Sequence, residues 1–313
     1  MRILIVKKKD SCWPFVEEQT SALAKKGVDS VYHTIKGKGI MSYVKDIVGL
    51  IQDIRLQKPD VIHAHYGMSG FYTCMVVRLM GLAQKMPVVV TYHGSDINNP
   101  KVRKFSQRAV RMADYNIFVS PLMMEMVKVG ENAQVIPCGI NWEDWPEMSK
   151  VEARKPIGLK SGKKYILFSS DFQTEVKNPE LAKASVAMMN GVELLELKGY
   201  TRAEVNKLMH AADVCLMTSK TEGSPQFIKE AMACGCPIVT TDVGDARFVI
   251  GDTEGCYFTD NNAEDCAKKL MNALEFAELY DRTNGRQRMK QLGYCNDKIA
   301  QRIYKIYNDL KNQ

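Results

Sequence analysis

Residues 218–245 read TSKTEGSPQFIKEAMACGCPIVTTDVGD, a pattern that predicts a strand end, a loop, a helix, a turn and a second strand. Ser224 is a good N-cap and Pro225 suits the first helical position, so we expect the helix to begin there and run to about Cys234. Gly235 and Pro237 should then end it. A helix between two short apolar strands is typical of a parallel sheet that helices cover on both faces.

The same alternation extends in both directions from this segment. The runs KYILFSS, VELLEL, DVCLMT and PIVTT predict strands, with helices over about 179–189 and 202–211. Nearer the start, RILIV, VDSVYHTI, DVIHAH and MPVVVTYH alternate with amphipathic stretches in the same way. The rhythm stops between Cys138 and Gly162, where we place a linker. The predicted fold class is therefore α/β, with two doubly wound, Rossmann-like domains.

The domain boundaries follow from this pattern. We predict one domain over residues 1–145, a second over 146–295, and a C-terminal helix over 296–313 that could pack back on the first domain. The composition, 45% hydrophobic and 25% charged in 313 residues, is that of a globular chain. No apolar run approaches the roughly 18 residues of a membrane span. Nine cysteines without disulfide or zinc spacing fit a reducing cytoplasm.

Positive charge is concentrated in the first half of the chain. The net charge is +7, and residues 1–145 hold 19 Lys and Arg against 13 Asp and Glu. Such a surface could meet anionic membrane lipid, a phosphorylated acceptor or nucleic acid, or could simply be solvated. Nucleic acid is disfavoured because the basic residues are not interleaved with aromatic side chains that could stack on bases. We therefore expect a cytoplasmic protein, with peripheral contact to the inner face of the membrane as a further possibility.

Two glutamates flank the start of the predicted helix. Glu222 precedes it and Glu230 lies within it, while the backbone around the helix start would offer N–H groups to a phosphate or to sugar hydroxyls. Glu222 would suit the hydroxyls of a sugar and Glu230 those of a ribose. Two solvent-exposed glutamates at a helix start would look the same, because the helix dipole favours them. The residues expected to supply this helix-start site are Gly223, Ser224, Pro225, Gln226 and Phe227.

The surrounding residues resemble the signature of glycosyltransferase family 4. In that signature a glutamate, a glycine and a second glutamate precede a small-residue helix and a G-x-P-[IV]-V strand, here Glu222, Gly223, Glu230, Gly235, Pro237, Ile238 and Val239. The segments IHAHYG, VVTYHGSD, VIPCGIN and AADVCLMTS also resemble that family in the expected order, so the resemblance covers most of the chain. It implies a GT-B fold, with two domains facing a central cleft. It also implies transfer of a hexose-type sugar, with retention, from a nucleoside diphosphate to a glycan, lipid-linked or small-molecule acceptor.

The resemblance also implies roles for individual residues. Lys177 in SSDFQTEVKNPELA matches the lysine of the family's phosphate loop, but Phe172 or Asp171 stands where that loop usually has an arginine. Arg247 or Lys220 could supply the second cation. With His93, which the resemblance assigns to the donor sugar, Lys177 and Glu222 form the expected catalytic set. Lys198 and Tyr200, in the loop LKGYTR, are expected to contact the donor.

On the acceptor side we expect Asp96, His65 and Tyr66. His63 and His65 face the same side of a strand and could form a metal pair, but we find no third ligand and favour packing or acceptor contact. Trp13 and Phe15 could stack on a sugar or merely pack. The basic loop KGKGIMSY, from Lys36, could meet an acceptor phosphate or simply turn.

Glycosyl transfer places growing negative charge on the departing diphosphate. Lys177 and the helix-start amides could stabilise it without a divalent ion, and we find no Asp-x-Asp motif placed for one. We therefore predict no metal and no cofactor. The predicted partners are a nucleotide sugar and a glycan or lipid-linked acceptor, as in cell-surface polysaccharide biosynthesis. The open alternatives are a nucleotide-sugar epimerase or phosphorylase of the same fold, or a binder without catalysis.

Overall fold

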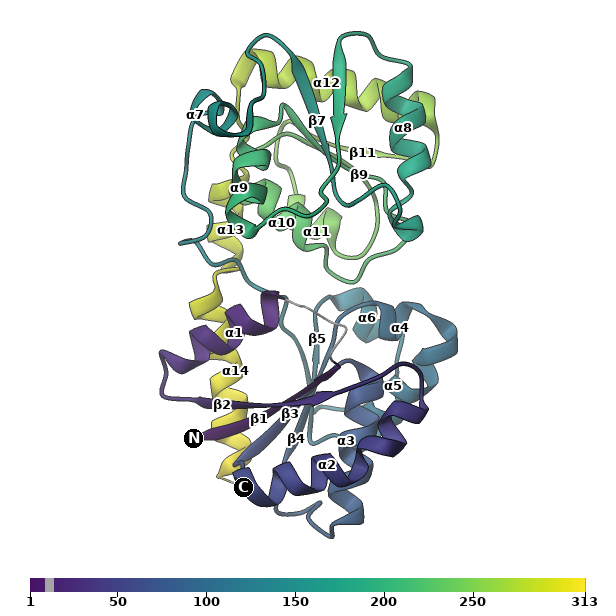
Figure 1. Cartoon of the computed structure of the whole chain (residues 1–313), viewed down its shortest axis with the longest axis vertical. Coiled ribbons are helices and arrows are strands. Elements are labelled where there is room, and N and C mark those ends of the chain that lie inside the picture. Colours follow the sequence, from purple (N-terminus) through teal and green to yellow (C-terminus); the bar gives the residue numbers. More distant parts are fainter. Residues whose placement is uncertain (9–13, 313) are drawn as a thin grey trace. The chain divides into compact units, whose positions relative to one another are not determined.

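The computed structural model describes residues 1–8 and 14–312, and the chain divides into two compact units (Figure 1). One unit is formed by Met1–Gly139 with Asn296–Gln313, and the other by Ile140–Cys295. The predicted boundary at residue 145 is thus too late. Ile140 and Trp145 are fully buried in the hydrophobic core of the second unit, which is why the segment between them belongs to it.

The first unit contains a six-stranded parallel sheet in the order β2-β1-β3-β4-β5-β6. Its strands are mostly apolar and buried on both faces, as expected for a sheet covered by helices. Asp29 of β2 pairs with Arg2 of β1, and Val88 of β4 with Ile62 of β3. The strands are β1 Arg2–Lys8, β2 Asp29–Ile35, β3 Val61–His65, β4 Val88–Tyr92, β5 Tyr115–Phe118 and β6 Ala133–Val135.

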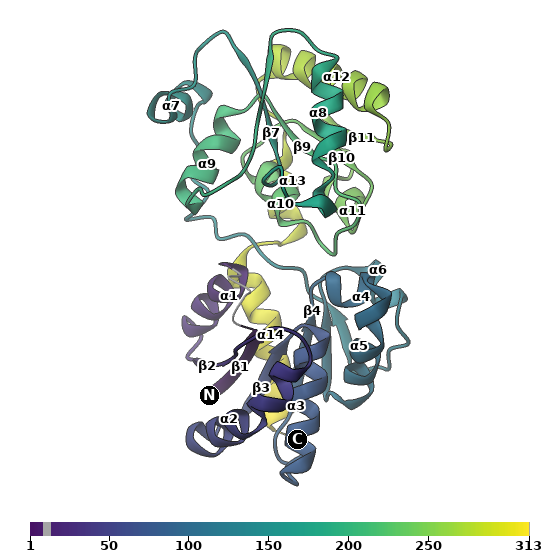
Figure 2. The same ribbon diagram turned by 45° about the vertical axis from the view of Figure 1, so that its right-hand side comes forward.

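Helices cover both faces of this sheet (Figures 1 and 2). Leu4 and Val6 pack with residues of α2, α3 and α5, whereas Ile3 and Ile5 pack with residues of α1 and α14. Successive side chains of a strand point to opposite faces, so the two helix groups lie on opposite sides. The helices are α1 Pro14–Ala24, α2 Met41–Gln57, α3 Gly67–Leu79, α4 Ser95–Asn98, α5 Pro100–Met112, α6 Pro121–Glu125 and α14 Asn296–Lys311.

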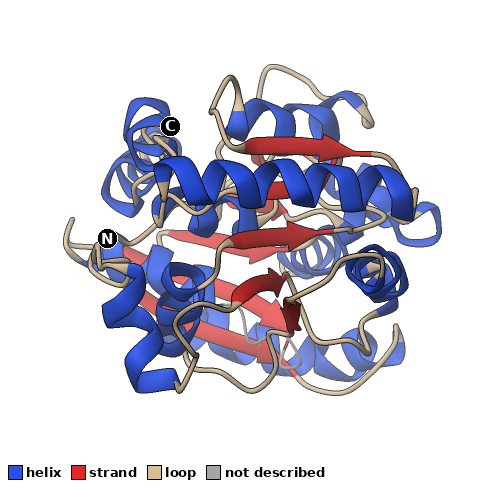
Figure 3. Ribbon diagram, turned by 90° about the horizontal axis from the view of Figure 1, so that it is seen from above, coloured by secondary structure: helices blue, strands red, loops and turns tan. Residues whose placement is uncertain are grey.

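The second unit repeats this plan with a five-stranded parallel sheet in the order β11-β10-β9-β7-β8. Figure 3, which colours the whole chain by secondary structure, shows strands with helices on either side. The strands are β7 Lys164–Phe168, β8 Val192–Leu195, β9 Val214–Met217, β10 Ile238–Thr241 and β11 Cys256–Thr259. The helices are α7 Lys150–Arg154, η1 Lys155–Ile157, η2 Glu175–Lys177, α8 Pro179–Ala187, α9 Arg202–Ala211, α10 Gln226–Ala233, α11 Ala246–Ile250, α12 Ala263–Tyr280 and α13 Gly285–Leu292. The predicted α/β class is therefore confirmed.

Local sequence signals explain several helix ends. Thr201 and Glu204 form a capping box, so α9 begins at Arg202 as predicted. Pro179 occupies the first turn of α8, where its missing N–H costs nothing. The side chain of Asn99 accepts from the amide of Lys101 at the start of α5. Among the described residues, no helix is both long and apolar enough to cross a membrane.

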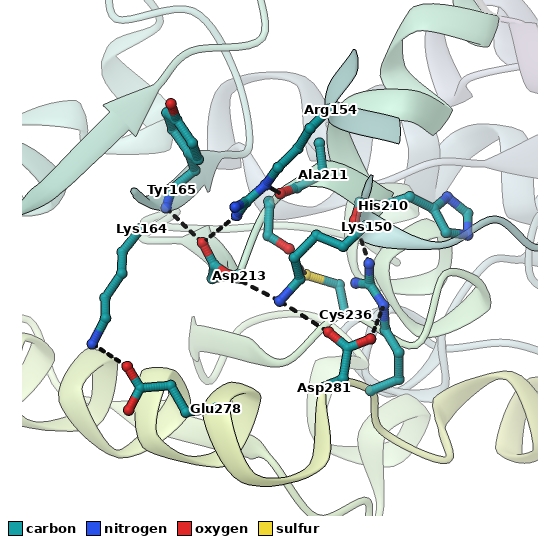
Figure 4. Close-up of polar contacts among 12 residues, drawn as sticks. Lys150, Arg154, Lys164, Tyr165, His210, Ala211, Asp213, Cys236, Glu278 and Asp281 are labelled. Atoms are coloured by element: carbon teal, nitrogen blue, oxygen red, sulfur yellow. Dashed lines mark hydrogen bonds and ion pairs between the residues drawn. The ribbon is translucent and has the colours of Figure 1, made fainter. Parts of the chain in front are cut away.

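A polar network fastens α7 to the body of the second unit (Figure 4). Asp213 accepts hydrogen bonds from the guanidinium of Arg154 and the backbone N–H of Tyr165, both at 2.7 Å. The ammonium of Lys150 lies 2.9 Å from Asp213 and 2.9 Å from Asp281. Asp213 directly precedes β9, so this network lies at the amino ends of the strands. Ligands in such sheets bind at the carboxyl ends of the strands, so this network is not part of the candidate ligand site.

Candidate functional site

Two loops at the carboxyl end of the second sheet are joined along η2. The hydroxyl of Thr218 donates to the carbonyls of Lys177 and Asn178, both at 2.9 Å. The backbone N–H of Lys220 donates to the carbonyl of Val176 at 2.9 Å. The loop after β9, which carries Glu222, therefore lies directly against the helical turn that carries Lys177.

Lys177 and Glu222 form an ion pair across these loops. The ammonium nitrogen of Lys177 lies 2.5 Å from Oε1 of Glu222. The Glu222 side chain is 16% exposed and that of Lys177 is 25% exposed, so both remain reachable from solvent. The structure thus brings together two of the three residues that the sequence predicts to be catalytic.

The helix after Glu222 begins one residue later than predicted. Pro225 is the capping residue of α10, and Ser224 does not cap the helix because its hydroxyl donates to Asp245 at 2.7 Å. Pro225 has no N–H, so it contributes no donor to the predicted helix-start site. The first-turn amides of α10 belong to Gln226, Phe227 and Ile228. In an α-helix, amides of the first turn do not donate to carbonyls of the helix itself. The helix stops at Cys234 as predicted, before Gly235.

The loop after β10 packs directly on the Glu222 loop. Gly244 has a φ of +61°, and a Cβ placed on it would lie 2.7 Å from the carbonyl oxygen of Gly223. Only glycine fits such an approach, so its position in TTDVGD has a packing reason. Next to it, burial raises the pKa of Asp245, while the charge of the buried Lys229 opposes that rise. Asp245 and Lys229 are not among the predicted site residues, because nothing in their spacing shows that they point inward.

Glu230 is paired with a residue from a different helix. Its Oε1 accepts from the guanidinium of Arg202 at 2.5 Å, and its side chain is only 7% exposed. The guanidinium of Arg202 also lies over the ring of Trp145, at 5.0 Å from the ring centroid. Arg202 directly follows the loop that contains Lys198 and Tyr200, both of which are exposed. Arg202 therefore connects two groups of residues predicted to bind the sugar donor: it follows the loop of Lys198 and Tyr200, and its side chain contacts Glu230 of α10. From the sequence, Arg202 is predicted only as the start of a helix.

The place of the family's loop arginine holds no cation. The backbone N–H of Phe172 donates to Glu196 at 2.7 Å. Asp171 accepts from the backbone of Gln173 and from Thr174, contacts that lower the pKa of its carboxyl. Of the two predicted substitutes, Lys220 lies 3.6 Å from Glu175 of η2. Arg247, on α11, pairs with Asp242 at 2.7 Å. Lys220 thus contacts η2, the helical turn that carries Lys177, whereas Arg247 lies on α11.

In the first unit, three histidine rings stack at the ends of β3 and β4. The ring centroids of His63 and His65 lie 4.5 Å apart, and those of His65 and His93 lie 5.2 Å apart. His63 is held by the hydroxyls of Tyr307 and Thr91, at 2.5 and 2.7 Å. His65 Nδ1 lies 2.9 Å from His93 Nε2. Burial, with a smaller effect of Lys7, lowers the pKa of His65 to about 3.

Several residues that the sequence analysis singles out lie in or around this stack. His93 is half-buried, with its ring centroid 4.9 Å from that of Phe15 and 4.7 Å from that of Tyr66. Phe15 therefore packs on a candidate catalytic residue, while Trp13 lies outside the described residues. His63 and His65 are buried and hydrogen-bonded. Within the described part of the chain, no group of three or more His, Cys, Asp or Glu is placed to hold a metal ion.

The carboxylate of Asp96 accepts hydrogen bonds from three backbone amides. One carboxylate oxygen accepts from the N–H of Gly67 at 2.9 Å, and the other from those of Gly94 and His93 at 2.9 and 3.1 Å. The side chain is buried, which raises the pKa of its carboxyl against the opposing effect of these amides. Asp96 therefore fixes the turn that carries His93, and its contact with an acceptor stays a prediction.

Comparisons with known proteins identify the family of the chain and its fold. The sequence model described as Glycosyltransferase Family 4 matches residues 16–144, and the one described as Glycosyl transferases group 1 matches residues 170–275. A Bacillus subtilis (strain 168) protein named as a teichuronic acid biosynthesis glycosyltransferase, TuaC, is 27% identical over 68% of this chain and 60% of its own length. The chain thus spans about three fifths of that relative.

Two solved structures share the fold over nearly the whole chain. Sucrose-phosphate synthase from Thermosynechococcus elongatus is 16% identical with a TM-score of 0.80, and the match covers 99% of both chains. The Anabaena protein HepE, solved in complex with UDP-glucose, is 16% identical with a TM-score of 0.77 over 99% of this chain and 100% of its own. At these identities the likeness shows the fold.

Proposed function

Because the chain belongs to glycosyltransferase family 4 and has the GT-B fold, we propose that it transfers a hexose-type sugar, with retention, from a nucleoside diphosphate. The observation that supports this most is the contact between Lys177 and Glu222 beside the first turn of α10. A cation, a carboxylate and the amides of a helix start at one carboxyl edge are what a diphosphate joined to a sugar requires.

The main chemical demand is stabilisation of the leaving group. As the bond from the sugar's anomeric carbon to the diphosphate oxygen breaks, negative charge grows on that oxygen. We propose that Lys177 and the amides of Gln226 and Phe227 bind the diphosphate there without a metal ion. The acceptor oxygen forms the new bond to the same face of the sugar, and its proton passes to the departing phosphate oxygen.

We propose different tasks for the two glutamates. Glu222 accepts hydrogen bonds from hydroxyls of the transferred sugar. Its pairing with Lys177 keeps the carboxylate from repelling the nearby phosphates. Glu230 accepts hydrogen bonds from the ribose hydroxyls, and its contact with Arg202 fixes the orientation of its side chain. The exposed Lys198 and Tyr200 would contact the base end of the donor. His93 remains a proposed catalytic residue that acts on the transferred sugar.

The comparisons suggest where to look for the substrates. The name of the Bacillus relative supports a cell-surface polysaccharide or its lipid-linked precursor as acceptor. The complex of HepE with UDP-glucose supports testing uridine nucleotides first. We propose that the chain acts in the cytoplasm, where nucleotide sugars would be supplied to it.

A thermal-shift screen with a donor-hydrolysis assay tests this proposal. Uridine, guanosine, adenosine and cytidine diphosphates and their sugars are compared, with EDTA present throughout. One nucleotide series should raise the free energy of unfolding, by about 2.7 kcal/mol at 100 times its dissociation constant. The same series should be hydrolysed slowly by the wild type and not by Glu222→Gln. No stabilisation by any nucleotide, or hydrolysis that needs added magnesium or manganese, would contradict the proposal.

A further inference from the structure

The second unit contains a polar cavity outside the candidate site, between the end of α11 and one side of α13. Its volume is about 250 Å³, below the roughly 300–1,000 Å³ that is typical of pockets for drug-sized ligands. The cavity therefore suits a ligand much smaller than a nucleotide sugar. The residues that line it are Asp252, Thr253, Asn284, Gln287, Arg288 and Gln291.

The cavity lies at the opposite edge of the sheet from the pair of Lys177 and Glu222. Thr253 comes shortly before β11. The backbone N–H of Thr283, which precedes the lining residues of α13, donates at 2.8 Å to the carbonyl of Gly235, just before β10. Lys177 and Glu222 instead follow β7 and β9. The strands are parallel, so their amino ends meet at one edge of the sheet and their carboxyl ends at the other.

One wall of the cavity is fixed by Arg288. Its guanidinium donates to the carbonyls of Phe248 and Val249 at the end of α11, at 3.0 and 3.4 Å. Gly251 has a φ of +55°, and a Cβ placed on it would lie 3.0 Å from Nη2 of Arg288. Glycine therefore lets the guanidinium lie against this turn. The buried Thr253 donates its hydroxyl hydrogen to the last carbonyl of α11 at 2.7 Å, which fixes the turn from the other side.

The other four lining side chains have polar groups that the fold does not use. In the part of the chain that the structure describes, no side-chain hydrogen bond or ion pair is formed by Asp252, Asn284, Gln287 and Gln291. Asn284 directly precedes α13, yet its side chain does not cap that helix. Gln287 and Gln291 are four residues apart and so lie on one face of α13. Three side-chain amides and one carboxylate thus line a hollow with their hydrogen-bonding groups available.

We propose that this cavity binds a neutral sugar unit, at a site separate from the donor site. Side-chain amides both donate and accept hydrogen bonds, as hydroxyls do, so a ring that carries several hydroxyls can satisfy all three amides. The carboxylate of Asp252 accepts from a further hydroxyl and would repel a phosphate, while the guanidinium of Arg288 would repel an ammonium group. The lining residues include no aromatic side chain, which disfavours a stacked nucleobase.

A sugar in this cavity would be neither the donor nor the hydroxyl that reacts, because the cavity is not at the carboxyl edge. A unit within a glycan and a free sugar offer the same hydroxyls to the amides. The proposal therefore names their shared chemistry, and the experiment separates the two sources.

Saturation-transfer NMR tests this binding and needs neither a nucleotide nor turnover. The purified full chain is mixed with the methyl glycosides of glucose, galactose, mannose and N-acetylglucosamine, and with the tetramers of glucose and of N-acetylglucosamine. We expect at least one of these sugars to bind, with a dissociation constant obtained by titration. The double variant Q287A/Q291A should weaken that binding at least about tenfold, in line with the loss of two hydrogen bonds.

Two further variants serve as controls. Q52A/Q301A makes the same change at exposed positions of α2 and α14 in the first unit, and it should bind the sugar as the wild type does. Glu222→Gln should also keep this binding, because it alters the other edge of the sheet. All three variants should keep the wild-type unfolding midpoint, which would show that they fold.

Comparison of a methyl glycoside with its tetramer identifies the source of the sugar. A tetramer that binds at least as well as the glycoside would show that the cavity takes a unit within a glycan. A tetramer that is excluded while the glycoside binds would show that the ligand is a free sugar. Either result supports the proposed chemistry of the cavity.

Three outcomes would overturn the proposal. The first is that none of the six sugars binds to the wild type. The second is that binding is unchanged in Q287A/Q291A. The third is that Glu222→Gln abolishes the binding, which would place the sugar at the donor site instead. We expect Q287A/Q291A to retain donor hydrolysis, so failure of this proposal is separate from failure of the proposed activity.

Discussion

The ammonium nitrogen of Lys177 lies 2.5 Å from a carboxylate oxygen of Glu222, although the two residues belong to loops that follow different strands. This contact resolves an electrostatic conflict. A lone carboxylate beside a helix start would repel the phosphates that the helix dipole attracts. Paired with Lys177, Glu222 can accept sugar hydroxyls while the pair as a whole carries no net charge.

The two glutamates should fail in different ways when changed. Glu230→Gln removes the proposed ribose acceptor, so it should weaken binding of the nucleoside diphosphate about tenfold, in line with the loss of a charged hydrogen bond. Glu222→Gln should leave that binding nearly intact and lower turnover about a hundredfold, because it acts on the sugar. Calorimetric titration and saturation kinetics measure the two quantities. Equal loss of binding in both variants, with turnover unchanged, would refute the division of roles.

The second cation of the diphosphate site can be identified by a matched pair of variants. Lys220 pairs with Glu175 of η2, the helical turn that carries Lys177. Arg247, on α11, pairs instead with Asp242. We therefore expect Lys220→Met to lower turnover about tenfold or more, and Arg247→Met to have little effect. The measurement is the rate of donor hydrolysis at saturating donor. The reverse order of effects would assign the role to Arg247.

The buried histidines should make the chain sensitive to acid. The pKa of His65 falls from 6.5 to about 3 on folding, because burial disfavours its charged form. The unfolded chain therefore binds one more proton between these values. The neutral His65 makes its full contribution to the free energy of unfolding above pH 6.5. That contribution is lost as the pH falls, with a slope of up to about 1.4 kcal/mol per pH unit.

His65→Phe provides the comparison for this effect. The variant keeps a ring in the stack but has no proton to gain, so its free energy of unfolding should fall less steeply below pH 6.5 than that of the wild type. Urea unfolding at a series of pH values gives both curves. The difference between them isolates His65 from other titrating groups such as His63, Asp96 and Asp245. Parallel curves would show that His65 is not kept neutral by the fold.

The sequence predicted what depends on local signals. The alternation of strands and helices, the start of α9 at Arg202 and the end of α10 before Gly235 follow from periodicity, a capping box and a glycine stop. These signals act over a few residues, so they can be read without knowing the fold.

What the sequence did not reveal depends on contacts between distant residues. Ser224 looked like an N-cap, but its hydroxyl is taken by Asp245, and α10 therefore begins later. Arg202 meets Glu230 from another helix, and nothing in its own segment indicates this. The sequence places Asp96 on the acceptor side but does not reveal that three backbone amides donate to its carboxylate. The early boundary at Gly139 likewise reflects where Trp145 is buried.

The central claim is that Lys177 and the start of α10 bind the diphosphate of a nucleotide sugar without a metal ion. Calorimetric titration of the nucleoside diphosphate found in the screen, in buffer with EDTA, tests it most directly. We predict that Lys177→Met weakens binding at least about tenfold, while Lys268→Met, at an exposed position of α12, binds as the wild type does. Equal affinity in wild type and Lys177→Met, or binding that appears only when magnesium is added, would contradict the claim.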